Sequence, residues 1–600
     1  MELNGSQILL RALMNEGVDT IFGYPGGSIL DIHDELFKSS HILAGHEQEA
    51  SRAAVGYPGG SILEIHDEQF KSPFNHILVR HEQGAAHAAD GYARSSGKVG
   101  VCLVTSGPGA TNTVTGIATA YMDSIPMVIV TGQVPTPFIG TDAFQEVDIT
   151  GITRPCTKHN FLVRHVDELA NTVREAFYIA RSGRPGPVLI DLPKDVMRAT
   201  TEYREPVSPS QGSAEPVYLP DAGPLAETID LIKKAKKPLL LIGGGVIHGR
   251  ATAELVKFAR KVNIPVTSTL MGLGGFPGTD PLWLGMLGMH GTYYANMAIS
   301  DCDLLITVGV RFSDRVTGRL ATFASNATIV QIDIDATSIN KNVLVHIPIV
   351  SDCRSALIQL NALLDRNGLE KIREGREDWI TRIGRWRTEG PMSYCQGDTI
   401  KPQCVIETLY RMTKGDAIVA TEVGQNQMWT AQFFRFDKPN TFLTSGGLGT
   451  MGYGFPAAIG AQVAFPDRLV VDIAGDGSIQ MNIQELATAV NYKLPVKVVI
   501  LNNGYLGMVR QWQELFYEKR YANTCIGGQC PDFVKLAESY GAVGLRAVKP
   551  EEVEPTIAKG LEAPGPVLMD FVVEAEEGVY PMVNPGASLT DMKLSSGIGM

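Results

Sequence analysis

Short apolar runs alternate along this chain with longer amphipathic stretches. The pattern is clearest at residues 469–474 (LVVDIA), which predict a buried strand, at 481–490, which predict a helix, and at 496–501 (VKVVIL), which predict a second strand. A strand, a helix and a strand in this order form a βαβ unit, so we expect the two strands to be parallel. Their carboxyl ends then lie at one edge of a sheet, where α/β folds bind their ligands.

The same alternation divides the chain into three α/β blocks, because 600 residues are too many for one hydrophobic core. Strands predicted at 99–104 and 126–130 belong to the first block, and a strand at 238–242 lies early in the second. We expect three doubly wound parallel-sheet domains followed by a tail, at residues 1–200, 215–365, 395–575 and 576–600. The stretch 205–224, rich in Pro and Ser, predicts a linker, and the charged stretch 365–390 predicts a helical connector.

Composition excludes several classes of protein. The net charge of −12 is not offset by a basic block, which argues against a nucleic-acid partner. The chain has no run of about eighteen apolar residues, so we expect no membrane partner, and residues 1–17 predict an amphipathic helix instead of a signal peptide. The eight cysteines form no CxxC pair and predict buried, reduced thiols. These features favour a cytoplasmic protein.

A segment near the N-terminus occurs twice. Residues 23–39 (GYPGGSILDIHDELFKS) recur at 56–72 as GYPGGSILEIHDEQFKS, and each copy continues to a His-Glu-Gln triplet. Two copies do not make a solenoid. The helix expected after the first triplet runs directly into the Pro-Gly-Gly of the second copy, which breaks it. We interpret the repeat as a tandem duplication, with units at residues 23–55 and 56–90.

Polar residues follow both strands of the predicted βαβ unit. Gly475-Asp476-Gly477-Ser478 comes after the first strand, and Asn502-Asn503 comes after the second. A carboxylate and an amide oxygen at one sheet edge, beside glycines that admit a phosphate, suit an octahedral Mg²⁺ that carries a diphosphate. Each short motif alone is equally compatible with an ordinary turn, but their spacing and the strands before them favour the metal site.

The pattern GDG followed by Asn-Asn resembles the signature of thiamine diphosphate enzymes. The sequence from 475 to 521 is similar to that of the large catalytic subunit of acetohydroxyacid synthases (acetolactate synthases). This resemblance covers essentially the whole chain apart from the repeat. It implies a pyrimidine-binding first domain, a central FAD-binding domain and a diphosphate-binding third domain.

The resemblance also implies roles for individual residues. Asp476 and Asn503 would bind Mg²⁺ by their side chains, and Tyr505 by its backbone carbonyl. The other residues that would bind thiamine diphosphate are Gln425, Met451, Gly477 and Ser478. Those that would bind FAD are Arg184, Gly244, Met289, His290, Arg311 and Asp333. Asn426 stands where the family usually has histidine, and Ser313 stands where it frequently has aspartate. The flavin would be structural, because the implied reaction has no redox step.

Substrate selection would depend on a cation and an aromatic side chain. Arg315 could hold the carboxylate of a 2-ketoacid through paired hydrogen bonds. Trp512 would shape the pocket for a methyl or ethyl group. The resemblance places Phe144, Gln145 and Lys194 at the pocket entrance.

The implied chemistry further requires a glutamate hydrogen-bonded to the aminopyrimidine ring of the cofactor. The repeat offers two, Glu47 and Glu82. We predict that Glu82 is the working residue, because the strand that ends there continues into a helix at 84–96, whereas the first copy has a charged residue in place of the following glycine. The glycine turn remains open between residues 23–27, which follow a strand, and 56–60, which lead to Glu82.

The activity implied by the resemblance is that of an acetolactate synthase. Pyruvate would be decarboxylated on thiamine diphosphate and the two-carbon unit transferred to pyruvate or 2-ketobutyrate, the first common step of branched-chain amino-acid biosynthesis. The implied assembly is a homodimer or homotetramer with a regulatory small subunit, in which Glu82 of one chain meets Asp476 of another. The alternatives are a pyruvate oxidase, against which Arg315 and Trp512 argue, a flavin-free fermentative acetolactate synthase, and a scaffold inactivated by the duplication.

Overall fold

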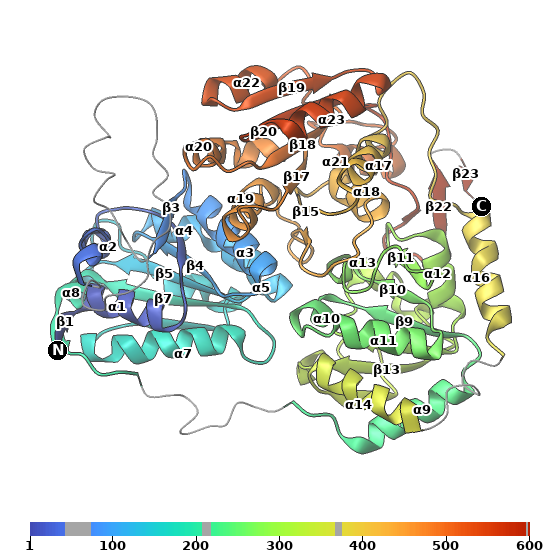
Figure 1. The fold of residues 1–600 in the computed structure, drawn as a ribbon, viewed down its shortest axis with the longest axis horizontal. Coiled ribbons are helices and arrows are strands. Elements are labelled where there is room, and N and C mark those ends of the chain that lie inside the picture. The colour runs from blue at the N-terminus through green and yellow to red at the C-terminus, as the bar shows by residue number, and fades with distance from the viewer. Residues whose placement is uncertain (43–73, 207–217, 367–374, 596–597, 600) are drawn as a thin grey trace. The chain divides into compact units, whose positions relative to one another are not determined.

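The structure, a computed structural model, describes residues 1–42, 74–206, 218–366, 375–595 and 598–599 (Figure 1). The chain forms two compact units: residues up to 214 make the first, except for Arg94–Gly97, which belong with the remainder of the chain in the second. Three six-stranded sheets, all of them parallel, organise these units. The α/β class and the three parallel-sheet domains predicted from the sequence are confirmed.

The first unit contains one sheet, with strand order β3-β2-β4-β5-β7-β6. In that order the strands span Asn75–Leu78, Thr20–Tyr24, Gly100–Val104, Met127–Gln133, Pro187–Pro193 and His159–Leu162. The helices that surround it are α1 (Gly5–Asn15), α2 (Leu30–Ile42), α3 (Glu82–Ser96), α4 (Pro108–Asn112), α5 (Val114–Asp123), α6 (Ile149–Thr153), α7 (Leu169–Arg181) and α8 (Lys194–Arg198). Helices α1, α2 and α7 bury Leu, Ile and Phe side chains against one face of the sheet.

The second unit contains two sheets. The central sheet has the order β11-β10-β9-β12-β13-β14, spanning Trp283–Met286, Val266–Ser268, Pro238–Ile242, Leu304–Val308, Thr328–Asp333 and Ile347–Val350. Its helices are α9 (Ala222–Lys234), α10 (Gly244–His248), α11 (Thr252–Val262), α12 (Tyr293–Asp301), α13 (Asp314–Thr317), α14 (Cys353–Arg366) and the connector helix α16 (Glu377–Glu389). Apolar clusters fill both faces of the sheet, as a doubly wound fold requires.

The C-terminal sheet has the order β16-β15-β17-β18-β20-β19, spanning Phe442–Leu443, Ile418–Thr421, Val470–Gly475, Lys497–Asn502, Val567–Val572 and Val543–Ala547. Its helices are α17 (Pro402–Thr413), α18 (Gln425–Phe433), α19 (Gly454–Ala464), α20 (Leu486–Asn491), α21 (Gly507–Phe516), α22 (Phe533–Tyr540) and α23 (Val553–Glu562). In each sheet the strand order changes direction beside an inner strand, between β2 and β4, between β9 and β12, and between β15 and β17. Such switch points open crevices at the carboxyl ends of the strands, where ligands bind.

The predicted βαβ unit is confirmed in its strands and differs in its helix. β17 and β18 are parallel neighbours, with Val471 opposite Lys497 and Gly475 opposite Leu501. The helix expected at 481–490 is instead two 3₁₀ turns followed by the short helix α20. Asn482 separates the turns, and its side chain donates to the Gly452 carbonyl at 2.6 Å. This tertiary contact overrides the local helical pattern.

The sheet of the first unit combines both copies of the repeat. β2 leads into the first copy, which supplies α2, whereas β3, which pairs with β2 at Thr20 and Asn75, comes from the second copy. The glycine turn of the first copy follows β2 at this sheet edge, where its Ser28 hydroxyl and the Thr105 hydroxyl are hydrogen-bonded at 2.9 Å. Residues 43–73, with Glu47 and the second glycine turn, lie outside the described residues. β3 ends at Leu78, before the predicted strand end at Glu82, and α3 begins at Glu82.

This arrangement predicts that two deletions of equal length differ in stability. Each deletion leaves a single unit. Removing residues 40–72 keeps Asp31 and Leu36, whereas removing residues 23–55 keeps their counterparts Glu64 and Gln69, and the two products are otherwise identical in sequence. Leu36 lies in the core, 2 % exposed. Because glutamine there buries an amide and loses apolar contacts, we expect the 23–55 deletion to unfold with a free energy lower by about 2–4 kcal/mol in urea titrations.

A back-substitution provides the matched control for the two deletions. Gln69→Leu in the 23–55 deletion should recover most of the lost free energy of unfolding. Equal stability of the two deletion proteins would show that α2 does not use Leu36 as a core residue.

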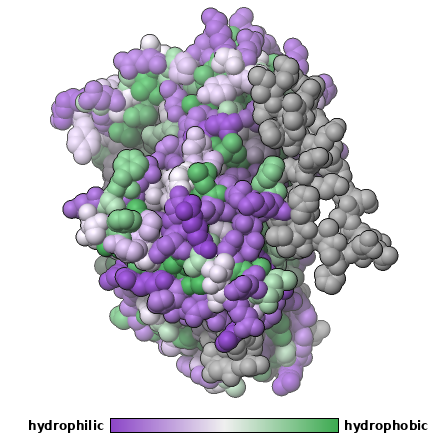
Figure 2. Space-filling view, turned by 90° about the vertical axis from the view of Figure 1, so that its left-hand side faces the viewer, coloured by the Kyte–Doolittle hydropathy of each residue, from purple (hydrophilic) through white to green (hydrophobic). Residues whose placement is uncertain are grey.

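The segment expected to be a tail packs instead. Val579 and Met582 are fully buried, and Leu589 and Met592 join the apolar cluster of the central domain. β21 (Met582–Val583) and β22 (Met592–Ser595) pair antiparallel. Among the described residues, no helix is long and apolar enough to cross a membrane. The face drawn in Figure 2 is a mosaic in which hydrophobic residues are scattered among hydrophilic ones.

Candidate active site

Loops at the carboxyl edge of the C-terminal sheet enclose a pocket. Its walls follow β15, β17 and β18, on both sides of the switch point. The lining residues are Val423–Asn426, Trp429, Met451, Gly475–Ser478, Leu501, Asn503 and Tyr505–Val509. The structure thus brings together seven residues that the sequence predicted for thiamine diphosphate and Mg²⁺: Gln425, Met451, Asp476, Gly477, Ser478, Asn503 and Tyr505.

Asp476 is a buried carboxylate at the end of β17. Its Oδ2 accepts hydrogen bonds from the Gly504 N–H at 3.1 Å and from the Cys530 thiol at 3.7 Å. Burial raises the pKa of the Asp476 carboxyl to about 6. A buried carboxylate whose two donors are both neutral is stabilised by a bound cation, as expected of a metal ligand.

Asn503 and Tyr505 complete an oxygen-rich corner. Asn503 Nδ2 donates to Gln425 Oε1 at 3.1 Å, and its Oδ1 accepts from the Tyr505 N–H at 3.1 Å. The carboxylate, amide and carbonyl oxygens available here are the ligand types that Mg²⁺ prefers. The residues present therefore fit the ion.

The pocket also suits a phosphate group. Gly424 has φ 155° and precedes the first turn of α18, whose N-terminus lies in the pocket wall. Helix N-termini attract anions through their unpaired N–H groups and dipole. A Cβ at Gly477 would lie 2.8 Å from Leu506 Cδ2, so a larger residue there would require the Leu506 side chain to move. Ser478 closes the turn by bonding the Gly475 backbone at 3.2 Å.

Asn426, the departure from the usual family histidine, faces the sheet. Its Nδ2 donates to the Glu422 carbonyl at 3.0 Å and the Ile473 carbonyl at 2.8 Å. The side chain therefore ties the end of β15 to β17.

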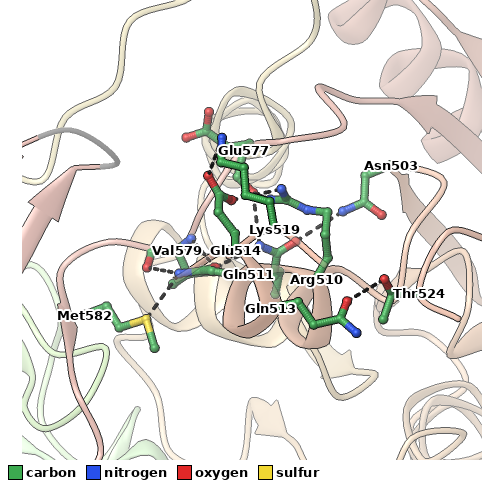
Figure 3. Close-up of polar contacts among 11 residues, drawn as sticks. Asn503, Arg510, Gln511, Gln513, Glu514, Lys519, Thr524, Glu577, Val579 and Met582 are labelled. Carbon is green, nitrogen blue, oxygen red and sulfur yellow. Dashed lines mark hydrogen bonds and ion pairs between the residues drawn. The ribbon is translucent and has the colours of Figure 1, made fainter. Parts of the chain in front are cut away.

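A hydrogen-bond network joins this pocket to the C-terminal segment (Figure 3). Gln425 Nε2 donates to Gln511 Oε1 at 2.9 Å and to the Glu577 carbonyl at 3.0 Å. Gln511 in turn pairs with both the N–H and the carbonyl of Val579, at 2.9 and 3.0 Å. The fully buried Arg510 pairs with Glu514 at 3.0 Å, as its dashed contact in Figure 3 shows. The packed segment 577–582 thus fixes the Gln425 amide that contacts Asn503.

The residues predicted for FAD lie at the carboxyl edge of the central sheet. Gly244 follows β9, Met289 follows β11, Arg311 follows β12, and Asp333 ends β13. The backbones of β9 and β12 come close at the switch point, because a Cβ at Gly245 would meet Gly309 Cα at 2.6 Å. This close approach resembles what a dinucleotide-binding crevice requires.

His290 and Arg315 are neighbours in the same region. The Met289 N–H donates to the Arg315 carbonyl at 2.9 Å. Burial lowers the pKa of His290 to about 4, and its Nδ1 has no hydrogen-bond partner among the described residues. The Arg315 guanidinium is more than half exposed and pairs with Asp314 at 2.7 Å. The neutral imidazole of His290 and the accessible guanidinium of Arg315 could both form hydrogen bonds with a polar ligand.

The first unit gathers the remaining candidates at its own sheet edge. Glu82 Oε2 accepts a hydrogen bond from Asn112 at 2.9 Å, and Lys194 donates to the Gly27 carbonyl at 2.7 Å. Gln145 has φ 60° and packs against Gly107, which follows β4. Phe144 is 88 % exposed. Lys194 thus reaches the loop after β2, and Gln145 the loop after β4, the two strands that flank the switch point.

Two predicted residues are not part of these groups. Arg184 bonds the Ser124 hydroxyl at 2.8 Å in the first unit. Trp512 lies on α21 outside the pocket lining, half-buried, with its ring edge-to-face with Phe516 at 5.5 Å.

Several polar residues around the pocket are not among those predicted from the sequence. Gln511, Cys530 and the buried pair Glu422 and Asp472 contact site residues or their loops. The signal for the pair was available, because Asp472 interrupts an apolar strand and Glu422 directly follows another.

Comparison with known proteins agrees with this geometry. Three domain families match the chain: "Thiamine pyrophosphate enzyme, C-terminal TPP binding domain" at 422–571, the corresponding central domain at 225–360, and the N-terminal TPP binding domain at 3–58 and again at 52–152. The overlapping N-terminal matches are what a duplicated segment produces. The chain therefore belongs to the thiamine diphosphate enzymes.

Similar sequences indicate which family of thiamine diphosphate enzymes the chain resembles. The chain is 47 % identical over 602 residues to the acetolactate synthase isozyme 3 large subunit of Escherichia coli (strain K12), covering 99 % of both chains. It is 46 % identical to the acetolactate synthase large subunit of Corynebacterium glutamicum, covering 99 % and 91 %, and 45 % identical to the chloroplastic acetolactate synthase 3 of Brassica napus, covering 98 % and 86 %. Within the thiamine diphosphate enzymes, this chain is a member of the acetolactate synthase large-subunit family.

Proposed function

We propose that the chain is an acetolactate synthase that joins two 2-ketoacid molecules with loss of carbon dioxide. The observation that carries the proposal is the pocket in which Asp476, Asn503, Tyr505, Gln425 and Met451 converge. Family membership along nearly the whole chain supports the same activity. Pyruvate is the proposed donor, and pyruvate or 2-ketobutyrate the acceptor, as in the first step of branched-chain amino-acid synthesis.

The proposed cofactors are thiamine diphosphate, Mg²⁺ and FAD. When bound, thiamine diphosphate supplies an electron sink for decarboxylation. Asp476 and Asn503 would hold Mg²⁺ by their side-chain oxygens and Tyr505 by its carbonyl, and the N–H groups at the N-terminus of α18 would attract the phosphates. Glu82 would hydrogen-bond a ring nitrogen of the aminopyrimidine and so hold a proton at that atom.

Substrate and flavin residues complete the proposal. Arg315 would pair with the acceptor carboxylate, since its guanidinium is accessible. Trp512 would limit the acceptor side chain, and Phe144, Gln145 and Lys194 would line the entrance. The residues proposed to hold FAD are Arg184, Gly244, Met289, His290, Arg311 and Asp333.

We propose a homodimer or homotetramer in which Glu82 and Asp476 of different chains serve one site, together with a regulatory small subunit. The names of the relatives, which are large subunits, support such a partner.

Product analysis tests the function and separates its rivals. The purified chain is incubated with pyruvate, thiamine diphosphate, Mg²⁺ and FAD, and acetolactate and flavin absorbance are followed together. We expect one acetolactate and one carbon dioxide for every two pyruvates, with the flavin remaining oxidised. Flavin reduction at the rate of pyruvate loss would favour a pyruvate oxidase, and undiminished activity in a preparation free of flavin would favour the fermentative enzyme. Activity only after deletion of residues 23–55 would mark the present chain as an inactive scaffold.

A further inference from the structure

Two carboxyl groups lie buried side by side beneath the cofactor pocket. Glu422 directly follows β15, and Asp472 lies on the neighbouring strand β17, where it pairs in register with Ala420. Both residues are completely buried. Neither has a role in the proposed reaction.

Glu422 caps α19, a helix that follows β16 in the chain. Its Oε2 accepts the Gly452 N–H at 2.6 Å, and its Oε1 accepts the Phe455 N–H at 3.2 Å. These N–H groups flank Tyr453, the N-cap residue of α19, whose own side chain makes no capping bond. A carboxylate at this position satisfies unpaired N–H groups and complements the helix dipole.

Asp472 lacks such donors. Neither oxygen of its carboxyl group has a hydrogen-bond partner among the described residues. It shares its side of the sheet with Ile418, Val470, Val498 and other members of an apolar cluster. Burial raises the pKa of Asp472 above its ordinary range, and the neighbouring Glu422 raises it further.

The start of α19 is packed against both acids. A Cβ on Gly454 would lie 2.3 Å from Asp472 Oδ1 and 2.5 Å from the Glu422 N–H nitrogen. Glycine is therefore required where the helix begins.

Within the part of the chain that the structure describes, neither carboxyl group forms an ion pair with a cation. A buried cation, Arg94, lies 5.2 Å from the centre of the Tyr453 ring, but its guanidinium donates to the Thr444 carbonyl at 2.8 Å. The sequences of α18 and α19 contain no charged residue, and β15 contains none. β18 contributes Lys497, which lies opposite Val471 on the other face and donates to the Ala563 and Gly565 carbonyls at 2.6 and 2.9 Å. Two buried carboxyl groups that lack an ion-pair partner favour a state with one proton between them, because ionising both is energetically costly.

We propose that Glu422 is a positioning residue for the cofactor, which fixes the turn carrying Met451 by capping α19, and that Asp472 retains the proton shared by the pair. Met451 precedes the capped Gly452 N–H by one residue and lines the pocket. Ionised Glu422 is favoured by its N–H donors, and neutral Asp472 by its apolar surroundings. Loss of the shared proton would place two charges in this site and loosen the turn. The inference rests on the proposed function only for the identity of the ligand.

The test measures binding of thiamine diphosphate with Mg²⁺ to the whole chain by calorimetry, together with urea unfolding without cofactor, from pH 6 to 9. The variants are Glu422→Gln, Glu422→Asp and Asp472→Asn. At pH 7 we expect Glu422→Gln to weaken binding about tenfold, because an amide is a poorer acceptor and presents an NH₂ group to backbone N–H groups. Glu422→Asp should recover part of the affinity, and Asp472→Asn should stay within about threefold of the unaltered chain.

The pH dependence has a defined sign. Burial raises the pKa of both acids on folding, so the stability they contribute is present at low pH and is lost as pH rises through their folded pKa values. Asp472→Asn removes the second ionisation, so affinity and unfolding free energy should fall less between pH 7 and 9 than in the unaltered chain. Asp476 is common to both proteins, and its titration cancels in this comparison.

Several results would overturn the proposal. Unchanged cofactor binding by Glu422→Gln would show that the cap does not position the pocket. Identical pH profiles for Asp472→Asn and the unaltered chain would show that the pair shares no proton, and this comparison still decides if Glu422→Gln fails to fold. Failure of acetolactate formation with intact cofactor binding would count against the proposed function and leave this inference standing.

Discussion

The Glu82→Gln chain is expected to lose acetolactate formation by a factor of at least about 10², whereas Glu47→Gln should stay close to the unaltered activity. The amide keeps the shape of the side chain but cannot hold or exchange a proton at the aminopyrimidine ring. Glu82 begins α3 directly after β3, and β3 is the second-copy strand that pairs with β2. The measurement is kcat for acetolactate formation with saturating cofactors.

Glu47→Gln is the matched control, because both glutamates belong to a His-Glu-Gln triplet. Cofactor binding measured separately distinguishes a lost proton contact from a misfolded site. Loss of activity in Glu47→Gln with retention in Glu82→Gln would contradict the assignment of the two copies. Equal, partial losses in both variants would mean that either copy can serve.

The Asp476→Asn chain is expected to need at least about 10²-fold more Mg²⁺ for half-maximal binding of thiamine diphosphate. The Asp476 carboxylate is the only charged group in the proposed ligand set. Because it is buried, its attraction to Mg²⁺ is less screened by solvent. Calorimetric titrations of thiamine diphosphate at several Mg²⁺ concentrations measure the effect without depending on turnover.

Asp467→Asn is the control for this substitution, since Asp467 is exposed in the loop before β17 and should bind Mg²⁺ and cofactor normally. An unchanged Mg²⁺ requirement in Asp476→Asn would remove this residue from the metal site. Activity lost with binding intact would assign it a role other than the one proposed.

The parts of the fold that follow from local pattern could be predicted from the sequence. Apolar runs such as residues 469–474 predicted buried parallel strands, and β17 and β18 have that pairing. The helix expected at 481–490 failed because Asn482 bonds the Gly452 carbonyl, a contact between distant segments that no local periodicity records. The sequence of the C-terminal segment predicts a tail, because the residues that the structure buries, among them Val579 and Leu589, follow no helical or strand period.

The candidate site divides in the same way. Asp476 and Asn503 could be predicted to converge because parallel strands bring their carboxyl ends to one edge, and both line the pocket. Gln511 could not, because its importance depends on its hydrogen bond to Gln425. The position of Glu422 directly after a strand is visible in the sequence, but its hydrogen bonds to the start of α19 are not. The use of the first glycine turn with the second-copy strand was likewise not predictable, since the two turns have the same sequence, GYPGG.

In the proposed homodimer, Glu82 of one chain and Asp476 of the other form one active site. The direct test is to mix inactive Glu82→Gln and Asp476→Asn chains under conditions that exchange subunits, and to measure acetolactate formation. Random pairing makes about half of the dimers mixed, and each mixed dimer regains one intact site of two, so recovery of about one quarter of the unaltered activity is predicted. No activity above that of the separate variants, with mixed dimers demonstrated, would contradict the shared site.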